Sequence, residues 1–158
     1  MQLFERILIP VDGSPQSHNA LMKGVELAKI DGSKIEILHV TTFSEEYPGF
    51  MSMNGNSTPQ ESAPPEWISE YIDNIRQNDR KMLDEALKSA KSIAPKLEIT
   101  VKLLTGRAVE NILEEADRGK FDLIIMGCRG LGGFREIVLG SVSHGVVNGS
   151  KIPVLIVK

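Results

Sequence analysis

Residues 122–147, DLIIMGCRGLGGFREIVLGSVSHGVV, contain the pattern that decides the fold. An apolar run ends at Gly127, Gly130 follows after two residues, and Gly140-Ser141 follows after nine more. The continuous apolar centre of the run predicts a strand that is covered on both faces, as in parallel sheets. The segment after Gly140 predicts a helix, so these glycines lie between a buried strand and a helix.

Strands and helices alternate along the rest of the chain. Apolar runs predict strands at residues 3–12, 34–40, 97–104, 121–127 and 152–158. Apolar residues at helical spacing predict helices at 13–32, 66–93 and 107–119, and a last one after Gly140. This alternation favours a parallel sheet with helices on both faces and right-handed crossovers.

Local signals indicate where some of these elements begin and end. Ser14 is placed to cap the first helix, Pro15 suits its first turn, and Gly32 suits its end. The third strand alternates in hydrophobicity, so we expect one of its faces to carry Leu97, Ile99, Val101 and Leu103.

Residues 43–65 have no period and are rich in Ser, Asn, Gly and Pro. The segment is long for a connection inside a compact domain, so we expect a flexible insert. The length of the chain suits one domain, and the sequence shows neither an internal repeat nor a second boundary. We therefore expect a single domain over residues 1–158.

Composition and charge exclude several classes of function. The formal net charge is −3 and the pI about 5.7, so there is no broad basic surface for nucleic acid. A single cysteine, Cys128, excludes an intrachain disulfide and favours a reducing compartment. The first residues lack the basic and apolar regions of a signal peptide, and no apolar run approaches the roughly 20 residues that span a bilayer. We therefore expect a cytoplasmic protein without a membrane partner.

Two of the predicted strands end in residues suited to a ligand. In an open parallel sheet, ligands bind beyond the carboxyl ends of the strands, where the strand order reverses. The first strand ends in PVDGS, which contains Asp12, and the fourth ends in MGCRG. Glycine lets backbone N–H groups approach a ligand, and successive N–H groups bind anions. Ser141 at a helix start, Ser143 one turn further and Arg129 in the glycine loop all suit phosphate.

Three other glycine motifs fit the chain poorly. A P-loop needs Gly-Lys-Ser/Thr, which the sequence lacks. The dinucleotide fingerprint G-x-G-x-x-G begins at Gly130 but has Arg135 in its last position. GCRG matches the GXXG loop of KH domains, yet it follows a buried strand in an acidic protein.

The stretch from Met126 to Ser143, MGCRGLGGFREIVLGSVS, matches the G-x2-G-x9-G-[ST] pattern of ATP-binding universal stress proteins. The fixed positions are filled by Gly127, Gly130, Gly140 and Ser141. The first strand and helix, EILHV at 36–40 and PVLIVK at 153–158 also resemble that family. The chain is therefore similar to UspA-like proteins throughout, except in the insert at 43–65.

The resemblance implies a fold, a ligand and a site. The fold is a Rossmann-like, adenine nucleotide alpha hydrolase-like three-layer sandwich, with a five-stranded parallel sheet in the order 3-2-1-4-5. The ligand is ATP, or ADP or AMP, and Mg²⁺ accompanies the phosphates. The residues implied to surround it are Pro10, Val11 and Asp12 on the adenosine side, Val40 at the adenine, Met126 and Gly127 at the nucleoside and ribose, and Arg129, Gly130, Gly140, Ser141, Val142 and Ser143 at the phosphates.

The resemblance also implies a nucleotide-dependent regulatory switch or adaptor in the stress response, forming a homodimer through the C-terminal strand 153–158. Two alternatives stay open. One is a slow ATP hydrolase, although Glu136 is the only acid near the expected phosphates and no clear general base is present. The other is a dimeric interaction module whose insert at 43–65 recognises a protein partner.

Most of the candidate residues also have a simpler structural explanation. Asp12 can cap the turn into the first helix, Ser141 can be a plain N-cap, and Arg129 can be a solvated surface residue. Cys128 is most simply an incidental thiol, and His39, within a strand, a residue with satisfied hydrogen bonds. No histidine has the spacing of a metal ligand, so we expect no metal site made of side chains.

Overall fold

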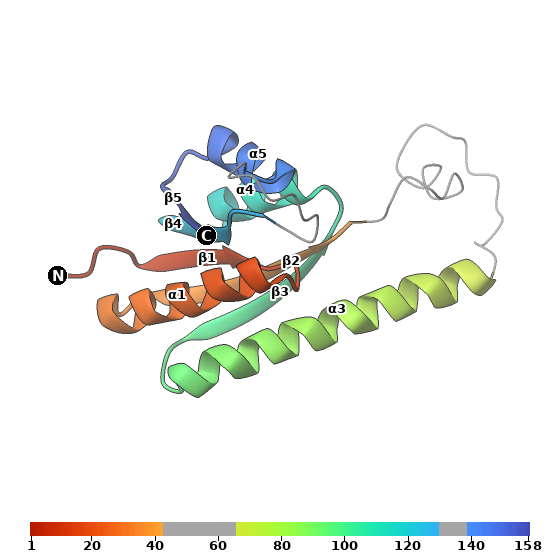
Figure 1. Cartoon of the computed structure of the whole chain (residues 1–158), viewed down its shortest axis with the longest axis horizontal. Coiled ribbons are helices and arrows are strands. Elements are labelled where there is room, and N and C mark those ends of the chain that lie inside the picture. Colours follow the sequence, from red (N-terminus) through yellow and green to blue (C-terminus); the bar gives the residue numbers. More distant parts are fainter. Residues whose placement is uncertain (43–65, 130–138) are drawn as a thin grey trace.

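Figure 1 shows the computed structural model of the protein, which describes residues 1–42, 66–129 and 139–158. Its elements in chain order are β1 (Arg6–Pro10), α1 (Pro15–Asp31), β2 (Lys34–Thr41), α3 (Glu66–Ile93), β3 (Ile99–Thr105), α4 (Ala108–Arg118), β4 (Leu123–Gly127), α5 (Ser141–Gly149) and β5 (Val154–Val157). The predicted insert at 43–65 and residues 130–138 lie outside the described residues.

The strands form one parallel sheet in the order β3-β2-β1-β4-β5, which confirms the predicted order. The central strand β1 pairs with β2 on one side, where Ile7 faces Ile35, and with β4 on the other, where Ile7 faces Leu123. After β1, the chain adds β2 and β3 along one edge of β1, and it later adds β4 and β5 along the other edge. The strand order therefore reverses between β1 and β4, and their carboxyl ends border a crevice.

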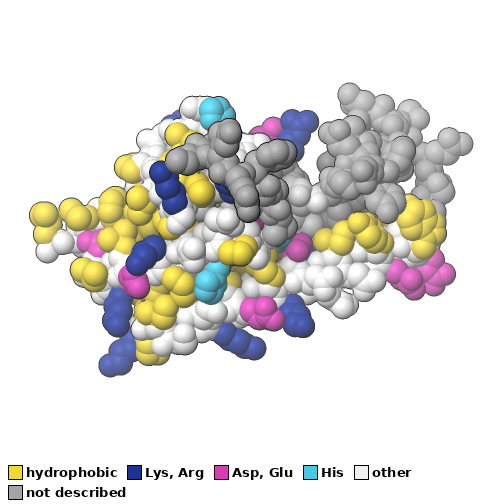
Figure 2. Space-filling model, in the orientation of Figure 1, with side chains coloured by type: hydrophobic (Ala, Val, Ile, Leu, Met, Phe, Trp, Pro, Cys, Tyr) yellow, Lys and Arg dark blue, Asp and Glu magenta, His cyan; other side chains and the backbone are white. Residues whose placement is uncertain are grey.

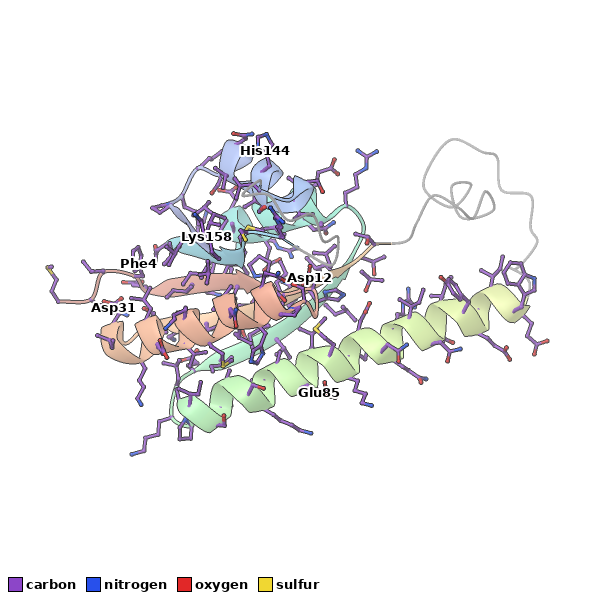
Figure 3. All side chains as sticks on the ribbon, viewed as in Figure 1. Phe4, Asp12, Asp31, Glu85, His144 and Lys158 are labelled. Atoms are coloured by element: carbon purple, nitrogen blue, oxygen red, sulfur yellow. The ribbon has the colours of Figure 1, made fainter. Side chains whose placement is uncertain are left out.

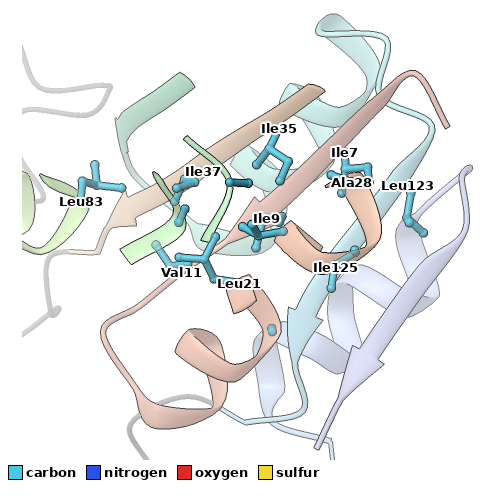
Figure 4. Close-up of a cluster of buried hydrophobic side chains, with 14 residues drawn as sticks. Ile7, Ile9, Val11, Leu21, Ala28, Ile35, Ile37, Leu83, Leu123 and Ile125 are labelled. Carbon is cyan, nitrogen blue, oxygen red and sulfur yellow. The ribbon is translucent and has the colours of Figure 1, made fainter. Parts of the chain in front are cut away.

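The sheet lies between two helical layers, with α1 and α3 on one face and α4 and α5 on the other (Figure 1). Successive residues of β1 point to opposite layers. Ile7 and Ile9 belong to the core cluster beneath α1 and α3, which Figure 4 shows, whereas Leu8 belongs to the cluster beneath α4 and α5. Burial on both faces explains why the central strands are continuously apolar.

The predicted limits of α1 are confirmed. The hydroxyl of Ser14, the N-cap, accepts a hydrogen bond from the N–H of Ser17 at 3.1 Å. At the other end, Gly32 has a φ of 80°, a left-handed conformation that favours glycine, and its N–H donates to the carbonyl of Ala28 at 2.8 Å. The hydrogen-bonded caps satisfy backbone groups that the helix itself leaves unpaired.

Two boundary predictions need correction. The third strand begins at Ile99, so Leu97 precedes it, and Val101 within it is 39% exposed. β3 is an edge strand, which the helical layer covers less completely than it covers β1. The last helix is capped by Gly140, so Ser141 is its first residue rather than its N-cap.

The surface in Figure 2 intersperses acidic and basic side chains, in keeping with the small net charge. In the described ranges, no helix combines the length and apolarity that crossing a membrane requires.

Candidate functional site

A cavity of about 400 Å³ lies where the carboxyl ends of β1, β2 and β4 meet the start of α5. It is lined by every residue that the sequence assigns to the site except Gly130, which lies outside the described residues: Pro10, Val11, Asp12, Val40, Met126, Gly127, Arg129, Gly140, Ser141, Val142 and Ser143. Residues more than 125 positions apart in the chain, such as Asp12 and Ser141, therefore share one concave surface. The topology brings them together because the strand order reverses at this point.

Sequence reasoning missed part of the cavity wall. Further lining residues come from α1, from the carboxyl end of β2 and from α4: Ser17, Leu38, His39, Thr42, Ala108 and Ile112. No local motif marks them, because Ile112 belongs to an apolar helical stripe typical of core and Ser17 to the first turn of a helix. Only the proximity of Leu38, His39 and Thr42 to Val40 in the sequence could have indicated their position.

Asp12 lies half-buried at the end of β1, beside the first turn of α1 (Figure 3). Its Oδ1 accepts a hydrogen bond from the N–H of Ser14 at 2.9 Å, and its own N–H donates to Ser17 Oγ at 3.3 Å. The carboxylate therefore does stabilise the turn into α1. A carboxylate has several acceptor sites, so Asp12 can also accept a hydrogen bond from a ligand through Oδ2.

Gly127 ends β4 at a point of close backbone approach. A Cβ at this position would lie 2.9 Å from the carbonyl carbon and 3.0 Å from the carbonyl oxygen of Gln16 in α1. Real Cβ atoms essentially never approach another atom as closely as 2.9 Å, so a side chain here would require β4 or α1 to shift. From the sequence we expect Gly127 to contact the ribose. The structure gives a second reason for glycine at this position, the close packing of β4 against α1, which no local sequence pattern indicates.

The start of α5 presents backbone N–H groups to the cavity. The N-cap Gly140 offers no side-chain hydrogen bond, and the first turn contains no acidic residue. The first N–H groups of an α-helix have no partner within the helix, and the helix dipole places partial positive charge there. Because Gly140, Ser141 and Val142 line the cavity, this end of it is suited to an anion.

Ser143 lines the cavity, and its hydroxyl also has partners within the protein. Its hydroxyl donates to the carbonyl oxygens of Cys128 at 2.8 Å and Gly140 at 3.0 Å, and the residue is only 3% exposed. The N–H of Gly140 also donates to the Cys128 carbonyl at 2.8 Å. Ser143 therefore links Cys128, which follows β4, to Gly140, the N-cap of α5.

A second cavity, of about 470 Å³, lies away from all of these residues. Its walls come from the end of α4 and from the segment between α5 and β5, and they include Leu113, Lys120, Phe121 and Ile152. The carboxyl ends of α4 and α5 border this space, and helix dipoles disfavour anions at that end. This second cavity is therefore less suitable for phosphate than the first.

No group of three or more His, Cys, Asp or Glu side chains in the parts of the chain that the structure describes could hold a metal ion.

The open parallel sheet with a cavity at its switch point defines a Rossmann-like α/β domain. The chain belongs to the universal stress protein family, whose model matches residues 3–158. Among its relatives is the universal stress protein YxiE of Bacillus subtilis, 31% identical over 156 residues that cover 99% of this chain and 100% of that protein.

Solved structures share the fold. The structure of MJ0577 from Methanocaldococcus jannaschii has a TM-score of 0.77 and 24% identity, covering 99% of this chain and 96% of that one. A universal stress protein solved in complex with cAMP has a TM-score of 0.65 and 24% identity over 98% and 97% of the two chains. One from Archaeoglobus fulgidus, in complex with dAMP, has a TM-score of 0.65 and 18% identity over 100% of both.

Proposed function

We propose that this universal stress protein binds ATP, or ADP or AMP, in the 400 Å³ cavity and acts as a nucleotide-dependent regulatory switch or adaptor. The observation that carries the proposal is that one cavity joins Asp12, at the end of β1, to the N-terminus of α5. A carboxylate suited to a hydroxyl and a helix start suited to an anion are the two ends that a nucleotide requires. Family members solved with cAMP and dAMP support an adenine nucleotide.

The adenosine would lie over the ends of β1, β2 and β4. Val11, Val40 and Met126 are buried apolar residues of the cavity wall, and they would cover the faces of the base. Asp12 Oδ2 would accept a hydrogen bond from a ribose hydroxyl. This arrangement gives the base an apolar slot and the sugar a polar partner, as is usual for small-molecule sites.

The phosphates would lie at the first turn of α5. The N–H groups of Ser141 and Val142 would donate to phosphate oxygens, and Arg129 would add positive charge from the cavity wall. The hydroxyl of Ser143 would support the phosphate end by linking Cys128 to Gly140 rather than by contacting the phosphates itself. Mg²⁺ would arrive with the phosphates and keep several waters.

The protein would form a homodimer through β5. This strand lies at an edge of the sheet, where one row of backbone groups has no strand beside it, and its Leu155 is 44% exposed. Two copies could pair their edges and cover these groups. A dimer would give a nucleotide-dependent adaptor two copies of any binding surface.

Calorimetric titration of the purified protein with ATP and Mg²⁺, and separately with AMP, tests the binding proposal. We expect saturable binding of ATP in the micromolar range or tighter and no comparable binding of GTP. The absence of binding at millimolar ATP would refute the proposal.

Ser141→Asp gives the experiment a sharp variant, because it should weaken ATP binding without lowering the stability of the protein. A carboxylate in the first turn of α5 favours the helix dipole and should leave stability unchanged or slightly raised. The same charge repels phosphate, so the affinity for ATP should fall at least tenfold. Ser69→Asp, at an exposed position near the start of α3, is the matched control and should bind ATP normally.

A further inference from the structure

His39 lies in the wall of the cavity and connects three elements of the fold, β2, β1 and α3. Its Nδ1 lies 2.7 Å from the carbonyl oxygen of Val11 at the end of β1, and its Nε2 lies 3.3 Å from Asp79 Oδ1 on α3. A carbonyl oxygen only accepts, so Nδ1 carries a proton in this contact. The side chains of His39 and Asp79 are only 12% and 19% exposed, so the contacts are largely shielded from water.

The contact with Val11 holds one particular peptide group. His39 holds the carbonyl of the Val11–Asp12 peptide, and the N–H of the same peptide donates to Ser17 Oγ at 3.3 Å. The N–H of Val11 donates to the carbonyl of Leu38 at 2.8 Å, which extends the pairing of β1 with β2. The plane of this peptide sets the direction in which Asp12 enters the cavity.

Asp79 in turn fixes the imidazole. Its Oδ2 accepts a hydrogen bond from the hydroxyl of Thr41, so one carboxylate contacts both His39 and Thr41. These two residues lie two apart on β2 and therefore share one face of the strand. Asp79 stands on α3, between the apolar residues Ile75 and Met82, and places a charge where the helix would otherwise present an apolar side chain.

We propose that His39 is a positioning residue of the nucleotide site and that Asp79 acts through it. Together they orient the Val11–Asp12 peptide, so that α3 controls the affinity of the adenosine end of the cavity. This inference rests on the proposed nucleotide function, and it assigns a binding role to residues that do not contact the phosphates. If α3 only packed against the sheet, an apolar residue at position 79 would suffice. Instead, Asp79 contacts His39, and His39 contacts the Val11 carbonyl in the cavity wall.

The binding test compares the affinities for adenosine and for inorganic triphosphate in four variants. His39→Leu removes the donor to Val11, and His39→Asn restores it, because the Asn amide nitrogen takes nearly the place of Nδ1. Asp79→Leu removes the support of the imidazole, and Asp84→Leu, exposed on the same helix, is its matched control.

We expect His39→Leu to weaken adenosine binding about tenfold and Asp79→Leu several-fold, with triphosphate binding unchanged. His39→Asn and Asp84→Leu should bind adenosine nearly as the unmodified protein does. Equal weakening of adenosine and triphosphate binding would indicate a general structural effect and would overturn the inference. Unchanged adenosine binding in His39→Leu would also overturn it.

Amide hydrogen exchange of Asp12, measured by NMR without nucleotide, separates this inference from the proposed function. Exchange should accelerate in His39→Leu and Asp79→Leu and return toward normal in His39→Asn. If the protein bound no nucleotide, the proposed function would fail, but this pattern would still support the positioning of the peptide by His39. Unaltered exchange in His39→Leu would overturn it.

Discussion

Glu36 on β2 and Glu115 on α4 place two carboxyl groups beside each other between the sheet and the helix. Burial raises the pKa of Glu115, but hydrogen bonds from Lys102, at 2.7 Å, and from Arg118 outweigh it and hold that pKa below its ordinary value. For Glu36, burial and the repulsion of Glu115 raise the pKa, and no donor among the described residues reaches its Oε1.

Glu36→Gln should therefore stabilise the protein at neutral pH, by about 0.5–1 kcal/mol, since an amide can donate to Glu115 without repelling it. In the unmodified protein the unfolded chain ionises Glu36 near 4.5 and the folded protein only at higher pH. The unmodified protein therefore loses stability as the pH rises from 4.5 through the pKa that Glu36 has in the folded protein. Because Glu36→Gln does not ionise, its stability advantage over the unmodified protein should shrink as the pH falls toward 4.5.

Urea unfolding at several pH values measures this difference. Glu85→Gln, exposed on α3, is the control and should show no such pH dependence. A Glu36→Gln variant that is less stable than the unmodified protein at neutral pH would contradict the assignment of an unfavourable buried charge.

Gly127→Ala should destabilise the protein by about 1–3 kcal/mol, because its Cβ would meet the Gln16 backbone, which cannot move aside as a side chain can. Gly32→Ala provides a comparison, since nothing lies within 4 Å of the added Cβ and only the positive φ is strained. Its cost should be nearer 1 kcal/mol. If Gly127→Ala unfolded like the unmodified protein and lost only nucleotide affinity, ligand approach alone would explain this glycine.

Asp31→Asn should lower the melting temperature at pH 7. The N–H groups of Leu3 and Phe4 donate to the carboxylate, each at 2.8 Å, and these bonds lower the pKa of Asp31 (Figure 3). A lowered pKa gives stability that is present above the ordinary value of 3.8 and is lost as the pH falls through the folded value.

The melting-temperature gap between the unmodified protein and Asp31→Asn should therefore close in acid. Asp84→Asn, an exposed change of the same kind, should show no gap at either pH. A gap that stayed constant from pH 7 to pH 2 would mean that the charge of Asp31 is not what holds the N-terminal segment.

Local sequence signals predict the elements of this fold well, and contacts between distant residues account for what they miss. The bounds of α3 and the cap at Ser14 follow from apolar spacing and from a residue type with one favoured position. The cavity followed from the strand ends and the family resemblance together. The contact of Gly127 with α1 and the link from His39 to Asp79 join residues 111 and 40 positions apart, so no local pattern displays them.

Ser141 illustrates a limit of the motif itself. The motif marks Gly140-Ser141 as a helix start, but it does not say which of the two residues caps the helix. In the structure Gly140 takes the N-cap with extended backbone, at φ −61° and ψ 163°. The N–H of Ser141 therefore lies in the first turn of α5. A side chain at the N-cap would bind some of the N–H groups of this turn, whereas Gly140 leaves them available to an anion.

Leu155→Asp should convert the proposed dimer to a monomer, because it places a charge at an edge strand that would otherwise be covered. The unmodified protein should show twice the chain mass of 17.4 kDa in sedimentation equilibrium. Ile30→Asp is the control, since Ile30 is 86% exposed near the end of α1 rather than on β5, and this variant should remain dimeric. A monomeric unmodified protein, or a dimeric Leu155→Asp, would place the interface elsewhere or remove it.

The crystal structure of the protein with ATP and Mg²⁺ tests the central claim most directly. We predict the adenosine at Asp12 and Val40, and phosphate oxygens about 3 Å from the N–H nitrogens of Ser141 and Val142. ATP bound instead in the 470 Å³ cavity beside Lys120 and Ile152, or crystals grown at saturating ATP without nucleotide at the start of α5, would contradict it.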